Sequence, residues 1–213
     1  MKHVPNILTL SRIPLLFVIV ALLCFNFPFG DTIALFLFVA AAISDWLDGY
    51  IARKLGAVSN FGKLMDALTD KIIMVGLFVA LLGLRWNFPD PYGNNADDMT
   101  TLLPQYCVLL VMVIICREFL ITGLRLVAAS NGIVLAAENA GKLKTTLQML
   151  SVSMLLAARA LAGDWVCCVP ENLIAWMREL GLWTFYAAVA LTIYSGTRYI
   201  IKNRKILTES GAK

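Results

Sequence analysis

The sequence predicts an all-α polytopic membrane protein with six transmembrane helices and with both termini in the cytoplasm. Three observations support this fold class. Of the 213 residues, 60% are hydrophobic and only 15% are charged, whereas ordinary soluble domains are about 45–50% apolar and about 25% charged. The apolar residues form long runs, and the few charges cluster between them. This composition excludes a soluble domain and a disordered chain, and the net charge of +4 is too small to indicate a nucleic-acid partner.

Three runs without charged residues are each 18 residues long, and they cover residues 13–30, 99–116 and 180–197. A helix rises about 1.5 Å per residue and the hydrocarbon core of a bilayer is about 30 Å thick, so each run nearly crosses it. With their flanking residues, these runs predict the first, fourth and sixth helices over 7–27, 104–128 and 181–203.

Three shorter apolar runs need charged neighbours to complete a membrane span. They contain 13 or 14 residues and cover residues 32–44, 72–84 and 145–158. At about 1.5 Å per residue, such a run covers only about 20 Å. The runs predict the second, third and fifth helices over 32–52, 63–84 and 140–161. Each of these helices then carries charged residues at one end.

Basic residues are distributed unequally between the two sides of this topology. With the amino terminus inside, 15 of the 18 lysines and arginines lie on the cytoplasmic side, as the positive-inside rule requires. The other side keeps Arg85, Arg159 and Arg178, and residues 86–100 are expected to form a polar external loop there. We therefore expect a single membrane domain over residues 1–213.

The five cysteines follow no metal-binding spacing. Packing as small apolar residues between helices is the favoured interpretation. The alternative is one disulfide among the four that lie nearest the outer surface, which are Cys24, Cys107, Cys167 and Cys168.

Four aspartates lie within 26 residues, at the predicted cytoplasmic ends of the second and third helices: Asp45, Asp48, Asp66 and Asp70. Asp45 and Asp48 are three residues apart, and the other two are four apart, so each pair shares one helix face. A short loop joins the two helices, and we expect both pairs to face each other at the same depth. Carboxylates within a membrane are costly and usually functional. Ion-paired helix ends that pack through glycines are the alternative.

The chemistry of this cluster favours divalent metal ions. Four carboxylates close together disfavour their own ionisation unless a positive charge neutralises them. A site built from oxygen ligands, without histidine or cysteine, suits Mg²⁺ or Mn²⁺, and four carboxylates are enough for two ions. Two such ions are typical of phosphoryl transfer. The spacing therefore predicts a dimetal phosphoryl-transfer site.

The residues around the aspartates suit a phosphate or a nucleotide. Gly49 and Gly62 leave the backbone open to a ligand. Arg53 and Lys63 supply positive charge, and Ser59 supplies a polar contact in the loop between the helices.

A second set of cations lies on the fourth and fifth helices: Arg117, Arg125, Lys142 and Lys144. An arginine inside a helix bundle is a candidate ligand for an anion, because its planar fork matches phosphate oxygens. These residues therefore predict a second, phosphorylated substrate. The alternatives are that Arg117 pairs with Glu118 or Glu138, and that the two lysines anchor the helix at the membrane surface.

The pattern Asp45-x2-Asp48-Gly49-x2-Ala52-Arg53-x8-Gly62-x3-Asp66-x3-Asp70 resembles the signature of the CDP-alcohol phosphatidyltransferase family at every fixed position. Within that family, three further groups resemble the bacterial members that use glycerol 3-phosphate as acceptor. They are Asn6, Thr9 and Arg12; Arg117, Glu118, Phe119 and Arg125; and Gly141, Lys142, Lys144, Thr145 and Gln148. The resemblance extends from about residue 5 to residue 203.

The resemblance implies a six-helix enzyme, usually a homodimer, in the bacterial inner membrane with its active site facing the cytoplasm. It implies Mg²⁺- or Mn²⁺-dependent transfer of a phosphatidyl group from CDP-diacylglycerol to sn-glycerol 3-phosphate, with release of CMP. The metal ligands would be Asp45, Asp48, Asp66 and Asp70, and Asp70 would also be the general base. The cytidine diphosphate would lie against Gly49, Arg53, Ser59, Gly62 and Lys63. The acceptor phosphate would bind Arg117, Arg125, Lys142 and Lys144.

Sibling enzymes of the same family are the nearest alternatives, with inositol phosphate, serine, inositol or phosphatidylglycerol as acceptor. Serine and inositol carry no phosphate, so the cations on the fourth and fifth helices argue against them. Inositol phosphate would fit these cations almost as well. A cation transporter is the alternative from another class, but it is expected to place carboxylates near the middle of the membrane rather than at one face.

Overall fold

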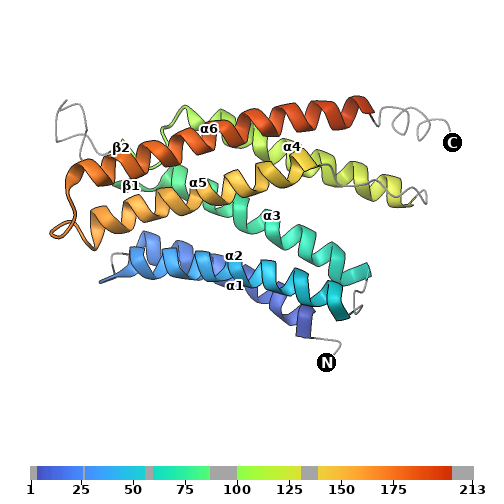
Figure 1. The fold of residues 1–213 in the computed structure, drawn as a ribbon, viewed down its shortest axis with the longest axis horizontal. Coiled ribbons are helices and arrows are strands. Elements are labelled where there is room, and N and C mark those ends of the chain that lie inside the picture. The colour runs from blue at the N-terminus through green and yellow to red at the C-terminus, as the bar shows by residue number, and fades with distance from the viewer. Residues whose placement is uncertain (1–3, 26, 56–59, 87–99, 131–138, 203–213) are drawn as a thin grey trace.

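The computed structural model describes residues 4–25, 27–55, 60–86, 100–130 and 139–202, and six long helices account for most of them (Figure 1). The helices are α1 (Val4–Cys24), α2 (Gly30–Leu55), α3 (Asn60–Gly83), α4 (Cys107–Ser130), α5 (Asn139–Gly163) and α6 (Glu171–Lys202). Five of the six begin within three residues of the predicted positions. The all-α fold class is confirmed for the described residues.

The sixth helix is longer than predicted, because it begins at Glu171 instead of residue 181. The prediction began at a run free of charges and so excluded Arg178 and Glu179, which the helix accommodates. Pro170 precedes the first turn and its carbonyl accepts a hydrogen bond from the Leu173 amide at 2.9 Å. An acidic residue in the first turn also interacts favourably with the helix dipole. At about 1.5 Å per residue the 32-residue helix is about 48 Å long, which exceeds the hydrocarbon core.

A short antiparallel strand pair interrupts the otherwise helical fold. In β1 (Arg85–Trp86) and β2 (Thr100–Thr101), Arg85 pairs with Thr101 and Trp86 with Thr100. The sequence did not predict this pair. It joins the two ends of the segment expected to be the external loop, of which residues 87–99 lie outside the described part of the chain.

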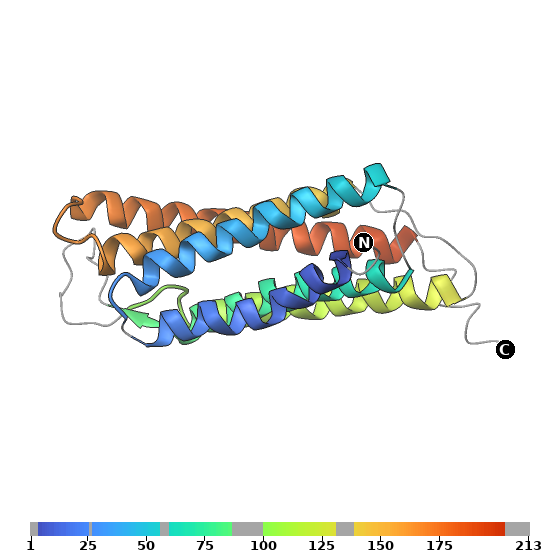
Figure 2. The same cartoon turned by 90° about the horizontal axis from the view of Figure 1, so that it is seen from below.

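The helices lie lengthwise in two layers, with α2, α5 and α6 in one layer and α1, α3 and α4 in the other (Figure 2). Helix α5 packs along α6, α1 packs against α2 and α3, and α4 packs against α6 and α3. Phe78 of α3 and Phe185 of α6 meet in the core, with ring centroids 5.4 Å apart. At Gly181 of α6, an added Cβ would lie only 2.9 Å from Leu155 Cγ of α5. Small residues of this kind let neighbouring helices approach closely in a membrane.

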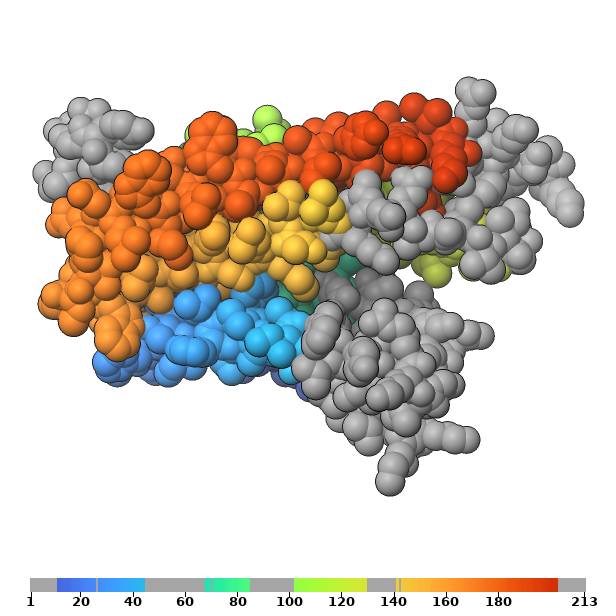
Figure 3. Space-filling view, viewed as in Figure 1, coloured from blue at the N-terminus to red at the C-terminus, as the bar shows by residue number. Residues whose placement is uncertain are grey.

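Large apolar side chains cover much of the outer surface, including Phe17, Phe36, Leu109, Trp176 and Trp183. Helices α2, α5 and α6 form one broad face of the molecule (Figure 3). An exterior with so many exposed aromatic and aliphatic groups is unusual for a soluble protein and suits contact with lipid. Among the described residues, two helical segments are long and apolar enough to cross a membrane, Cys107–Ala129 and Leu143–Gly163. Three further apolar helical segments are shorter: Ser11–Cys24, Gly30–Ser44 and Lys71–Gly83.

A buried ion pair joins α2 to α5 at the end of the bundle where α2 begins and α5 ends, and a hydrogen bond from its arginine reaches α1 in the other layer. Arg159 Nε donates a hydrogen bond to Asp31 Oδ1 at 2.7 Å, and Arg159 Nη2 donates to the Leu23 carbonyl at 2.6 Å. Beside this pair, the amide and hydroxyl of Thr32 both donate to Asp164 Oδ2, at 2.8 and 2.6 Å. These contacts attach the turn between α1 and α2 to the end of α5.

All five cysteines are free thiols, so the alternative of a disulfide among Cys24, Cys107, Cys167 and Cys168 is wrong. Cys107 is buried in the core, as expected for a small apolar residue, whereas the other four cysteines are exposed.

Candidate active site at one end of the bundle

The four aspartates of the signature occupy corresponding positions on two helices. Asp45 lies ten residues before the end of α2 at Leu55, and Asp70 lies ten residues after the start of α3 at Asn60. The two helices run in opposite directions, so these ends lie at the same end of the bundle (Figure 1). The backbone therefore places both pairs at a similar depth. The side chains of all four aspartates lie outside the described residues, and their mutual contact stays a prediction.

The side chains of the residues predicted to bind the nucleotide also lie outside the described part of the structure. Gly49 and Arg53 lie in α2, and Gly62 and Lys63 lie in α3, but their side-chain environment is outside the described part of the structure. Ser59 lies outside the described residues altogether.

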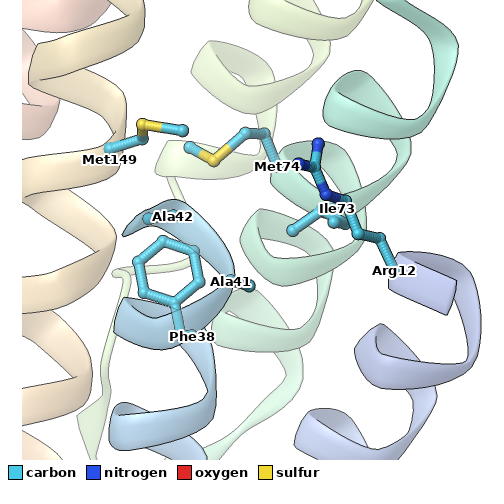
Figure 4. Close-up of a pocket in the computed structure, with 7 residues that line it drawn as sticks. All are labelled: Arg12, Phe38, Ala41, Ala42, Ile73, Met74 and Met149. Carbon is cyan, nitrogen blue, oxygen red and sulfur yellow. The ribbon is translucent and has the colours of Figure 1, made fainter. Parts of the chain in front are cut away.

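A small cavity lies next to the aspartate-bearing segments, between α1, α2, α3 and α5 (Figure 4). Its volume is about 20 Å³, enough for about one water molecule. Ala41 and Ala42 line it from α2, about one turn before Asp45, and Ile73 and Met74 line it from α3, about one turn after Asp70. The cavity is therefore adjacent to the predicted metal site.

Arg12 of α1 lines this cavity and is only 4% exposed. Figure 4 shows its side chain directed toward Ile73 and Met74 of α3. Arg12 belongs to one of the groups in which the sequence resembles family members that use glycerol 3-phosphate. Its burial beside the predicted metal site differs from the exposure expected of a cation at the membrane surface.

The predicted anion-binding residues meet on three helices. Arg117 of α4 donates from Nη1 to Glu118 Oε1 at 3.2 Å and from Nη2 to Ser195 Oγ of α6 at 3.1 Å. Lys144 of α5 forms an ion pair with the same Glu118 carboxylate. The side chains of Arg117, Glu118 and Lys144 are 14%, 13% and 4% exposed. We call these three residues the cation cluster.

Pairing with Glu118, which was the alternative for Arg117, does occur, but it does not neutralise the cluster. One carboxylate is shared by two cations, so the three side chains keep a positive charge. Lys144 also lies within electrostatic range of Lys71 on α3. Burying a positive charge is expensive unless an anion or a dipole compensates for it. The cation cluster is therefore suited to a bound anion.

Helix α6 holds Arg117 in place. An added Cβ at Gly196 would lie 2.9 Å from Arg117 Cγ, so the arginine stem lies directly against the backbone of α6. Any larger residue at this position would displace that stem.

Arg125 lies two turns after Arg117 on α4, and it contacts α6 through Tyr199. Its Nε donates to the Tyr199 hydroxyl at 3.3 Å, and its guanidinium carbon lies 5.5 Å from the centre of the tyrosine ring. Arg125 is within electrostatic range of Arg117. The structure thus brings Arg117 and Lys144 together through Glu118, with Arg125 adjacent, whereas the side chain of Lys142 lies outside the described residues.

Two buried donors near this cluster have no hydrogen-bond acceptor among the described residues: Arg117 Nε and Gln148 Nε2. Most buried polar atoms in proteins are paired, so each exception calls for an explanation. A bound ligand that carries acceptor oxygens is one explanation for a buried donor of this kind.

Sequence reasoning missed the part of the site that α6 supplies. The segment that includes Tyr199 was predicted only as part of the sixth membrane-spanning helix, with no site residue in it. A signal was present, since Thr192, Ser195, Gly196 and Tyr199 recur at helical spacing and all are buried. Such a stripe of polar and small residues in an apolar helix indicates a face that contacts other helices or a ligand.

The donor set of the four aspartates fits a hard divalent cation, because it is made of carboxylates from two helices at a similar depth. Among the residues with described side chains, no group of three or more histidine, cysteine, aspartate or glutamate residues could hold a metal ion.

Comparison with known proteins places the chain in a family. The family model for CDP-alcohol phosphatidyltransferase matches residues 2–194, and the chain belongs to this family. It is 35% identical over 223 residues to a CDP-diacylglycerol–glycerol-3-phosphate 3-phosphatidyltransferase of Bacillus subtilis, covering 99% of this chain and 100% of the relative. A protein of the same name from Rickettsia typhi is 33% identical, covering 93% of this chain and 96% of the relative. The resemblance found in the signature is confirmed.

Proposed function

We propose that this protein is a phospholipid-biosynthetic transferase that moves a phosphatidyl group from CDP-diacylglycerol to sn-glycerol 3-phosphate and releases CMP. The observation that carries the choice of acceptor is the cation cluster, in which Arg117 and Lys144 share one carboxylate and keep a positive charge. Membership of the CDP-alcohol phosphatidyltransferase family supports the reaction type, and the names of the bacterial relatives support this acceptor.

In this proposal Asp45, Asp48, Asp66 and Asp70 hold two divalent cations, Mg²⁺ or Mn²⁺. When bound, these ions supply charge stabilisation at the phosphate oxygens and at the leaving group. Gly49, Arg53, Ser59, Gly62 and Lys63 bind the cytidine diphosphate group and orient it. The diacyl chains remain in the lipid beside the apolar outer surface.

The chain's own residues then position the acceptor and move one proton. The cation cluster and Arg125 bind the phosphate of glycerol 3-phosphate, and this fixes the direction of its primary hydroxyl. Asp70 accepts the hydroxyl proton while the hydroxyl oxygen forms a bond to the lipid-bearing phosphorus. The bond from that phosphorus to the CMP oxygen breaks, and CMP leaves with the electron pair. Proton transfer of this kind typically contributes about 10²–10⁴-fold to a rate.

The proposal includes six membrane spans, with both termini and the active site on the cytoplasmic side of the bacterial inner membrane. The excess of lysine and arginine on that side supports this orientation, and the apolar exterior supports insertion into lipid. A homodimer is also part of the proposal, on the strength of the family resemblance.

Acceptor preference tests the proposal. Purified protein is incubated with CDP-diacylglycerol, Mg²⁺ or Mn²⁺, and one acceptor at a time, and CMP release is measured. We expect sn-glycerol 3-phosphate to outperform serine, inositol, inositol phosphate and phosphatidylglycerol. Faster release with any of those four would show that the acceptor is wrong, and no release without added divalent cation is expected.

A further inference from the structure

We infer that Gln148 is a further acceptor-binding residue, whose side-chain amide donates a hydrogen bond to the phosphate group of the acceptor. This inference rests on the proposed function. Gln148 is 3% exposed, and its Nε2 has no hydrogen-bond partner within the described part of the chain.

The position of Gln148 on α5 is what connects it to the site. Successive residues of a helix are rotated by about 100°, so Gln148 is about 40° round the helix from Lys144 and about one turn deeper. Lys144 reaches Glu118 on α4, whereas Met149 lines the small cavity beside the aspartate-bearing segments. Around the axis of α5, Gln148 lies between Lys144, which faces α4, and Met149, which faces the cavity. It therefore faces the interior between the cation cluster and the predicted metal site.

Further along the same face of α5, the next side chains already contact α6. Gln148 is therefore the last polar side chain on this face that has no internal partner among the described residues. Ser151 Oγ donates to the Gly181 carbonyl of α6 at 2.9 Å, and beyond it Leu155 packs against Gly181. The polar part of this face therefore ends near Gln148, which would form the floor of the acceptor site. Arg117 Nε, another buried donor atom without an acceptor among the described residues, belongs to the cation cluster.

A buried amide donor without an acceptor destabilises the folded protein. Such a cost is expected where a ligand supplies the acceptor and binding offsets it. A phosphate group offers several strong acceptor oxygens, and a hydrogen bond to a charged group is stronger than one between neutral groups. Removal of the amide should therefore have two effects. The stability of the ligand-free protein should stay equal or rise, whereas acceptor binding should weaken.

The test substitutes Gln148→Met, which keeps the length of the side chain and removes its polar atoms. We expect the acceptor KM to rise about tenfold, the KM for CDP-diacylglycerol to stay within about twofold, and the thermal midpoint of the ligand-free protein to be equal or higher. Ser153→Ala is the matched control, because Ser153 Oγ bonds to Met149 O of its own helix and lies on the opposite face of α5. An unchanged acceptor KM, or a fall in thermal midpoint with equal changes in both KM values, would overturn the inference.

A second variant and the wild type make each outcome decisive. If Gln148→Met does not fold, Gln148→Glu replaces it, since its carboxylate matches the amide in size and repels phosphate; an unchanged acceptor KM in that variant would also refute the role. If the wild type prefers a different phosphate-bearing acceptor, the proposed function fails alone, and the variants are compared with that acceptor. If the wild type prefers an acceptor without phosphate, both the proposed function and this inference fail.

Discussion

Lys144 of α5 forms an ion pair with Glu118 of α4, and Arg117 donates to the same carboxylate from the next position on α4. Because two cations share one buried carboxylate, the three side chains together keep a positive charge. The proposed position of the acceptor phosphate rests on this shared carboxylate more than on the number of basic residues in the sequence.

Replacing Glu118 with glutamine should make the protein more dependent on a bound anion. Loss of one partner from a buried ion pair costs about 3–5 kcal/mol, which corresponds to a fall of about 6–20 °C in Tm for a chain of this size. Inorganic phosphate should restore part of this loss, because it can take the place of the carboxylate between Arg117 and Lys144. The phosphate-induced rise in Tm is therefore expected to be larger for Glu118→Gln than for the wild type.

The control for that experiment is Glu179→Gln. Glu179 forms an ion pair with Arg178 at 3.6 Å and its side chain is 38% exposed, so the pair contributes about 0–1 kcal/mol. Equal effects of phosphate on the wild type and on Glu118→Gln would show that the cation cluster is not an anion site.

Gly196→Ala should weaken acceptor binding through Arg117. The added Cβ would lie 2.9 Å from Arg117 Cγ, near the root of that side chain, so the whole guanidinium group must shift. We expect the acceptor KM to rise several-fold with little change in the KM for CDP-diacylglycerol. Gly123→Ala on α4 is the matched control, since no atom lies within 4 Å of its added Cβ. Identical steady-state kinetics for the two variants would rule out this role of α6.

Asp31→Ala should reduce stability and leave the chemistry intact. It leaves Arg159 buried without the carboxylate that now lies 2.7 Å from its Nε, at the far end of α2 from the aspartates of the signature. We expect a fall in Tm of about 6–20 °C, a smaller fall for Asp31→Asn, and specific activity within about twofold of the wild type at low temperature. Loss of activity at a temperature where the variant is fully folded would place this end of the bundle in the catalytic mechanism.

Asp70→Asn tests the assignment of the general base. The substitution removes a proton acceptor and keeps the size of the side chain, so we expect the turnover number to fall by at least about 10²-fold. Tm should stay close to that of the wild type. Substantial residual turnover would remove Asp70 from this role.

The sequence was sufficient to predict the helices because each of them overlaps a charge-free apolar run of 13 to 18 residues. The start of α6 was predicted wrongly, since a count of charge-free residues cannot include Arg178 and Glu179, which the helix tolerates beyond the apolar run. The pair of short strands was missed because two-residue strands leave no periodic signal.

Pairings between distant residues were the least predictable part of the site. Arg159 was assigned to the outer side, but nothing in the sequence indicates that it bonds to Asp31 across 128 positions. Ser195 and Tyr199 were missed for the same reason, because their roles depend on which face of α6 meets α4. The aspartate motif was predicted from spacing alone, since residues three and four apart share a face in any helix.

The most direct measurement compares sn-glycerol 3-phosphate with glycerol as acceptors, for the wild type and for Arg117→Ala, in the presence of CDP-diacylglycerol and Mg²⁺. The two acceptors differ by the phosphate group that the cation cluster is proposed to bind. For the wild type we expect kcat/KM for CMP release to be at least about 100-fold higher with glycerol 3-phosphate, equivalent to about 2.7 kcal/mol. Arg117→Ala should reduce this ratio about tenfold or more by raising the acceptor KM. A wild-type ratio near one, or a ratio that Arg117→Ala leaves unchanged, would contradict the account.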